Sequence, residues 1–147
     1  MITAQQTAAQ KSLLPMGWGR FAKAIDHLID VSHPDEQLLA ACVTLNPTFV
    51  HRAITLAGEL YELRNSTNVV LAATNERLII IATGIGGRPM NTEQLPYEGM
   101  EIVARDKKET TLRWPDGEAR FHGAAKPMLA PLLLVLDERT RAAGSAS

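Results

Sequence analysis

The sequence predicts an α+β fold in which antiparallel strands form a barrel or two packed sheets, with one helix near the amino terminus and another at the carboxyl terminus. Apolar residues recur at helical spacing from Phe21 onward. From Asn68 the chain changes to short apolar stretches separated by turn sequences, which is typical of an antiparallel meander. Near the end, leucines follow the i, i+3, i+4, i+7 pattern of an amphipathic helix at Leu129, Leu132, Leu133 and Leu136.

Length and composition indicate a single domain. The chain has 147 residues, of which 46% are hydrophobic, and this is enough to bury one core. Residues 1–17 are rich in Gln, Ala and Thr without a sustained period, and residues 142–147 are small and polar. We therefore expect a domain over residues 18–141 with a flexible tail at each end.

The first half of this domain is expected to contain two helices and a strand. The helical stripe that begins at Phe21 stops at "SHPD", because Pro34 disfavours a helical conformation in the residue before it. The stretch "QLLAACVTL" (residues 37–45) is apolar almost throughout, as in a strand buried on both faces. The "NP" pair that follows resembles an N-cap and a first helical residue, which predicts a second helix over residues 47–63.

The stretch "VVLAATNERLIII" (residues 69–81) predicts a hairpin that is apolar on both faces. Pairing across its "NE" turn puts one apolar set toward the core and leaves a second set facing outward. A monomer should not expose such a strip, so we expect a helix of the same chain or of a neighbouring copy to cover it. This predicts a homo-oligomer and an interface with the following members: Val70, Ala72, Ile79, Ile81, Phe21 and Ile25.

Two later hairpins are assigned a register from their turn sequences. A three-residue loop at residues 107–109 opposes Ile102 to Trp114, and a turn at "PDGE" opposes Leu112 to Phe121. These pairings place the apolar residues on one inner face.

Arginines on the outer face are the candidate binding residues. The same register sets Arg113 directly opposite Arg120, and like charges in these positions repel unless an acceptor lies nearby. Neighbouring glutamates can supply that acceptor, in which case the face is only solvated. The alternative is an anionic group of a ligand or a partner protein, for which Arg88 is the third candidate. The glutamates in question are Glu101, Glu109 and Glu118.

Charge and hydropathy argue against several classes of protein. A net charge of −1 does not provide the clustered positive charge that nucleic-acid binding requires. The longest mostly apolar run, "PMLAPLLLVL", is too short to cross a bilayer. Cys42 is the only cysteine and lies in an apolar strand, so we expect a buried and unreactive thiol. We expect a cytoplasmic protein with no nucleic-acid partner and no membrane insertion.

No group of residues in the sequence predicts catalysis. His27, Asp30, His33 and Asp35 are close in sequence, but on a helix the two histidines lie on different sides and cannot face one metal ion unless the helix ends between them. The "GIGGRP" stretch leads toward a strand, whereas a phosphate-binding loop leads into a helix. We expect a protein that is not an enzyme and that needs no cofactor or metal.

The order of these segments resembles the bacterial pleckstrin-homology-like (PH-like) domain family over roughly residues 36–141. The resemblance is carried by a strand ending in Thr74, a short turn, Arg77 before an apolar run, and then Tyr97 before an Ile–Val strand. It implies a barrel that is plugged by the terminal helix. The segment 47–67 departs from the pattern, because it is longer than a simple first hairpin requires.

The resemblance implies a non-catalytic binding or scaffolding domain that acts through protein–protein contacts, including self-association. Lipid binding is not carried over, because the first strand contains no Lys or Arg. The alternative is a small enzyme or a small-molecule carrier with a pocket at the loop 84–91.

Overall fold

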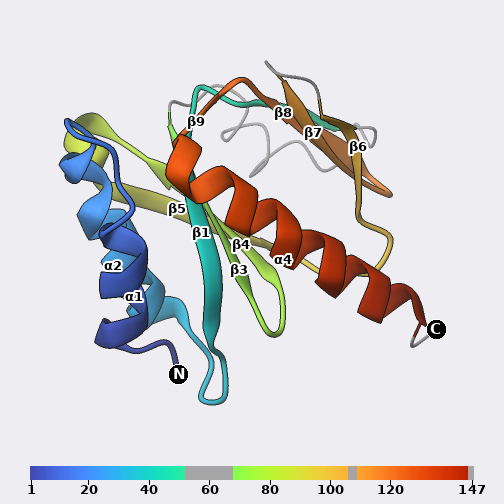
Figure 1. Ribbon diagram of the computed structural model, residues 1–147, viewed down its shortest axis with the longest axis horizontal. Helices are drawn as coiled ribbons and strands as arrows, with labels where there is room; N and C mark the ends of the chain where they lie inside the picture. The colour runs from blue at the N-terminus through green and yellow to red at the C-terminus, as the bar shows by residue number, and fades with distance from the viewer. Residues whose placement is uncertain (52–67, 106–108, 146–147) are drawn as a thin grey trace.

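The computed structural model describes residues 1–51, 68–105 and 109–145. These residues form an α+β fold of two antiparallel sheets with helices at both ends of the chain, as the sequence predicts (Figure 1). The helices are α1 (Ala4–Lys11), α2 (Ala22–Val31) and α4 (Lys126–Ser145), with short 3-10 turns η1 (Gly19–Phe21) and η3 (Ile85–Gly87).

The five-stranded sheet has the order β5-β4-β3-β1-β9 and the four-stranded sheet the order β2-β8-β7-β6. Within the described ranges the two sheets do not close into a barrel. The strands of the first sheet are β1 (Leu38–Leu45), β3 (Val69–Thr74), β4 (Leu78–Thr83), β5 (Pro89–Leu95) and β9 (Gly123–Ala124). Those of the second are β2 (Thr48–His51), β6 (Glu101–Arg105), β7 (Thr110–Trp114) and β8 (Gly117–Phe121).

The chain passes from one sheet to the other between β1 and β2. Asn46 has a φ of 47°, a left-handed conformation that asparagine tolerates better than most residues, and it redirects the chain before Pro47. Strand β2 then pairs with β8. The predicted helix over residues 47–63 is therefore wrong for residues 48–51, because pairing with β8 prevails over the local helix signal, and its remainder lies outside the described residues.

Residues 1–17 contain α1, where the sequence predicted a flexible tail. Thr3 and Gln6 form a capping box at its start, and Ile2 is fully buried. The backbone N–H groups of Leu38 and Ala41 donate to the side chains of Gln6 and Gln10, so α1 covers the edge of β1 that β9 does not reach. At the other end of the chain, residues 142–145 are helical as well.

The two-faced hairpin is covered within its own chain, in a core to which α2 contributes Ala24, Ile25 and Leu28. The β3–β4 register is as predicted, with Leu71 opposite Ile80 and Val70 opposite Ile81. Within the single chain, α1 and α2 lie on one side of β1 and α4 lies on the other (Figure 1). The residues predicted to form an interface are all fully buried in this one core, which excludes them from the surface: Val70, Ala72, Ile79, Ile81, Phe21 and Ile25.

The predicted pairings in the second sheet are wrong, although the predicted inner face is correct. Leu112 pairs with Ala119 and Trp114 with Gly117, across a two-residue turn at Pro115 and Asp116. A shift of two residues in register leaves every side chain on its original face, so Leu112 and Phe121 are both buried as expected. Ile102 pairs with Leu112, next to a bulge in β6.

Helix α4 packs against β1, with further contacts to β3 and β6. Met128, Leu132 and Leu136 are fully buried along one stripe, whereas Leu129 and Leu133 are only half-buried at its margin. Among the described residues, no helix combines the length and the apolar character needed to cross a membrane.

Candidate functional site

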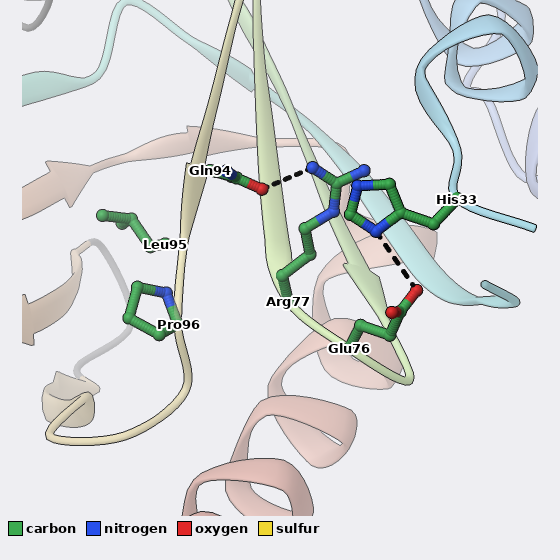
Figure 2. A pocket seen from close by; sticks show the side chains of 6 residues that line it. All are labelled: His33, Glu76, Arg77, Gln94, Leu95 and Pro96. Carbon is green, nitrogen blue, oxygen red and sulfur yellow. Dashed lines mark hydrogen bonds and ion pairs between the residues drawn. The ribbon is translucent and has the colours of Figure 1, made fainter. Parts of the chain in front are cut away.

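A pocket lies where β5 ends, beside the turn between β3 and β4. Its volume is about 420 Å³, a size within the range of small-ligand sites. Figure 2 shows Leu95 and Pro96 on one wall, with Arg77, Glu76 and His33 on the other and Gln94 between them. The wall that carries the charges comes from the β3–β4 turn and from the loop that follows α2.

Arg77 lines the charged wall of the pocket and is held there by a bidentate contact with Glu36. Its Nε donates to Glu36 Oε2 and its Nη2 to Glu36 Oε1, both at 2.9 Å. Nη2 also donates to the carbonyl of Val31, and Nη1 donates to the side-chain oxygen of Gln94. These bonds use four of the five guanidinium N–H groups, and among the described residues the fifth, on Nη1, is left for a ligand.

Glu36 is held as a carboxylate. Burial alone would raise its pKa, but hydrogen bonds from Arg77, from Thr74 Oγ1 at 2.6 Å and from the backbone N–H of His33 outweigh that effect and lower the pKa to about 2. The hydrogen bond to Glu36 raises the pKa of Arg77 in turn. The pair is therefore fully ionised at neutral pH, and its two charges cancel.

Thr74 and Tyr97 fix the turn that presents Arg77. Thr74 Oγ1 accepts from the backbone N–H groups of Glu76 and Arg77, both at 3.1 Å. The hydroxyl of Tyr97 lies 2.6 Å from the carbonyl oxygen of Thr74 and 2.8 Å from that of Arg77, and its single proton is shared between these two acceptors. Burial raises the pKa of Tyr97, so this hydroxyl keeps its proton.

His33, Glu36 and Glu76 have ligand atoms that all lie within 4.8 Å of one another, a spacing that suits a metal ion. The bonding of Glu36 argues against one. Both of its carboxylate oxygens already accept hydrogen bonds from Arg77, and a cation at this point would have to displace the guanidinium. His33 and Glu76 are left as a contact of 3.5 Å between two partly exposed side chains.

No known family model matches the chain, and no curated protein shows significant sequence similarity to it. The site is therefore interpreted from its own geometry.

The three arginines predicted to bind an anion do not converge. Arg88 lies at the start of β5 in the first sheet, whereas Arg113 and Arg120 lie on β7 and β8 in the second. Arg113 pairs in register with Glu118 rather than with Arg120, and Arg120 Nε donates to the same Glu118 at 2.8 Å. Glu101 lies opposite Arg113 on the other side. The alternating charges support the interpretation of a neutralised face.

The remaining candidates from the sequence do not come together in one site. His27 and His33 separate, since His27 contacts Asp30 and His33 contacts Glu76. Cys42 is fully buried, and burial raises the pKa of its thiol to about 12. The loop 84–91, proposed for a small-molecule pocket, contains η3 and leads into β5 at the end opposite the pocket described above.

Sequence reasoning missed the central role of Glu36. Nothing in the local pattern marks it, because its partners come from Thr74 and Arg77, about 40 residues further along the chain. The recurring positions of the PH-like resemblance were the available signal: Thr74, Arg77 and Tyr97 lie together in one hydrogen-bonded cluster.

Proposed function

We propose that the chain is a non-catalytic PH-like binding domain that takes up an extended segment of a partner protein along β5, the outer strand of the first sheet in the described part of the chain. The observation that carries this proposal is the difference between the two edges of the first sheet. Glutamines of α1 cap the β1 edge, whereas β5 is largely exposed along its length and ends at the pocket. An exposed sheet edge next to a side-chain pocket suits the addition of a peptide strand.

The PH-like part of the proposal is supported by the arrangement of elements. The chain passes from β1 in one sheet to β2 in the other, a meander follows, and a terminal helix packs against β1. The cluster of Thr74, Arg77 and Tyr97 adds a structural reason for the recurrence of these residue types.

The non-catalytic part is supported by the protonation states at the site. General acid–base catalysis works best with a group whose pKa is near the working pH. Glu36 is lowered to a pKa of about 2, and the pKa of Tyr97 is raised by burial, so neither exchanges a proton easily at neutral pH.

The pocket favours a neutral or basic side chain of the bound segment. The charge of Arg77 is cancelled by Glu36, so the exposed carboxylate of Glu76 dominates the local field. Leu95 and Pro96 provide an apolar wall for the stem of such a side chain. The buried single cysteine supports a cytoplasmic location for the interaction.

The test is selection of a random peptide library on the immobilised chain, followed by titration of enriched peptides and hydrogen exchange. We expect peptides to slow exchange of β5 amides and to bind Glu76→Lys about tenfold more weakly, a loss of about 1.4 kcal/mol. Asp116→Lys, the same charge change at the exposed β7–β8 turn, should bind as the parent does. Absence of enrichment, or protection at another strand, would contradict the proposal.

Self-association is a separate outcome of the same experiment. The apolar strip gives no reason for it, because that strip is buried within one chain. If β5 amides become protected as the protein concentration rises without any peptide, the occupant of the edge is a second copy of the chain.

A further inference from the structure

Three apolar side chains are exposed at the end of the first sheet opposite the pocket. Met16 is 100% exposed, Ile85 is 97% exposed and Met90 is 55% exposed. Single exposed apolar residues are ordinary on protein surfaces, but these three are brought close together by the fold.

Two tight turns hold Met16 and Ile85 outward. The N–H of Trp18 donates to the carbonyl of Pro15, with Gly17 at a φ of 89°, and Met16 lies at the tip. The N–H of Gly87 donates to the carbonyl of Gly84, with Gly86 at a φ of 74°, and Ile85 lies at the tip. In both turns an apolar residue precedes a glycine in the left-handed region, so both side chains are presented by a fixed backbone.

The two turns are adjacent because η1 and η3 pack backbone against backbone. A Cβ added at Gly87 would lie 2.3 Å from the carbonyl oxygen of Arg20, so only glycine permits this approach. Met90 folds back over the second turn, since its Cγ would be 3.0 Å from a Cβ at Gly84. Figure 1 shows the loop before η1 beside the η3 loop.

The surroundings of this tip are basic. Residues 12–25 and 84–92 contain Arg20, Lys23 and Arg88 and no Asp or Glu, although the whole chain has a net charge of −1. All three basic side chains are exposed. The half-buried Trp18 packs edge-on against Phe21 beneath them. The tip therefore combines exposed apolar side chains with three exposed basic side chains on the same two segments of the chain.

We infer that this tip, formed by Met16, Ile85, Met90, Arg20, Lys23 and Arg88, docks on the surface of an anionic membrane. Basic side chains attract acidic lipid headgroups, and exposed apolar side chains enter the boundary between headgroups and acyl chains. The small apolar area favours a bilayer over a protein, because three apolar residues present far less surface than a stable protein interface, which buries about 800 Å² per partner. This contact is peripheral and needs no spanning helix.

The test is co-sedimentation of the full chain with phosphatidylcholine vesicles, with and without about one third phosphatidylglycerol, at low and high salt. We expect binding only to the anionic vesicles, with a marked loss at high salt. A Met16→Ser, Ile85→Ser double variant and a Lys23→Glu, Arg88→Glu double variant should each bind about tenfold or more weakly. Matched changes on α4, Leu134→Ser and Arg141→Glu, should leave binding unchanged, since both positions are exposed and remote from the tip.

Insertion of the tip into the bilayer is measured by tryptophan fluorescence. Trp18 and Trp114 are the only tryptophans, so a Trp114→Phe variant leaves the reporter beside the tip. Quenching of Trp18 by brominated lipid would support docking. The inference is overturned if anionic vesicles do not bind the parent at low salt, or if the tip variants bind as well as the parent. Binding to poly-glutamate without binding to vesicles would also overturn it and would indicate an acidic protein partner.

Discussion

Arg77 holds both carboxylate oxygens of Glu36 across 41 residues of sequence. Glu36 has no exposed side-chain surface and Arg77 is only 13% exposed, so the pair is shielded from solvent on most sides. It ties the loop after α2 to the β3–β4 turn and so positions the charged wall of the pocket. Because the pair is buried, removing one partner has a different consequence from removing both.

Arg77→Met should destabilise the fold by about 3–5 kcal/mol, because it leaves a buried carboxylate without its cation. The double variant Glu36→Gln, Arg77→Met should recover most of this loss. Lys11→Met is the matched control, since both side chains of the Lys11–Asp26 pair are partly exposed and its loss should cost about 1 kcal/mol or less. Urea denaturation gives all the values, and a single Arg77 variant as stable as the parent would contradict the assignment.

Stability should fall in acid through Glu36. Its pKa is about 2 in the folded state against 4.5 in the reference state, so its contribution is present above pH 4.5 and is lost as the pH falls toward 2. The loss corresponds to about 3 kcal/mol. The variant Glu36→Gln lacks this carboxyl group and so lacks its pH-dependent contribution. As the pH falls from 4.5 toward 2, the parent should therefore lose more stability than the variant, and the difference between their free energies of unfolding should become smaller. A gap that stays constant from pH 6 to about 2.5 would show that Glu36 titrates normally.

Two neighbouring glycines should respond differently to alanine. Gly86 and Gly87 both have positive φ, but a Cβ at Gly86 meets open space whereas one at Gly87 meets the carbonyl of Arg20. Gly86→Ala should cost about 1–2 kcal/mol of backbone strain. Gly87→Ala should cost more, because η3 must also move away from η1. Equal melting temperatures for the two variants would exclude the close approach.

The inner face of the second sheet is tested by truncation. Leu112→Ala and Phe121→Ala should each destabilise the fold by about 2–5 kcal/mol, because both side chains are buried in the core. Calorimetry would check this, and a variant that melts within a degree of the parent would place its side chain outside the core.

The apolar strip is tested by a buried charge. Ile79→Asp should prevent folding, since Ile79 is fully buried in the single chain and an isolated carboxylate there has no partner. Leu134→Asp, at a position 67% exposed on α4, should fold normally. A folded, monomeric Ile79→Asp protein would mean that the strip faces solvent.

Local patterns predicted the elements whose partners are near in sequence. The stripe from Phe21 and the two-faced hairpin at residues 69–81 are present as predicted, because spacing and turn chemistry decide them. Residues 48–51 were mistaken for helix because their β partner lies in β8, about 70 residues away. The turn after Trp114 was assigned two residues too long, an error that sequence periodicity cannot detect, since it preserves the faces.

The candidate site was harder to predict from the sequence, because its residues are also far apart along the chain. Arg77 and Tyr97 were noticed only through the PH-like resemblance, and Glu36 lies in a loop with no period at all. A buried ion pair is specified by where three segments meet, and no single segment contains that information.

The passage of the chain from β1 through Asn46 into β2 has a consequence for how the molecule opens. Strand β1 pairs with β9 in the first sheet, and β2 pairs with β8 in the second, so the chain crosses between the sheets from β1 to β2 and again from β8 to β9. The two sheets are also joined by one hydrophobic core that contains residues of both, so they should not unfold as independent foldons. Amide protons at the centres of β3 and β7 should therefore report the same opening free energy in native-state hydrogen exchange, although they belong to different sheets.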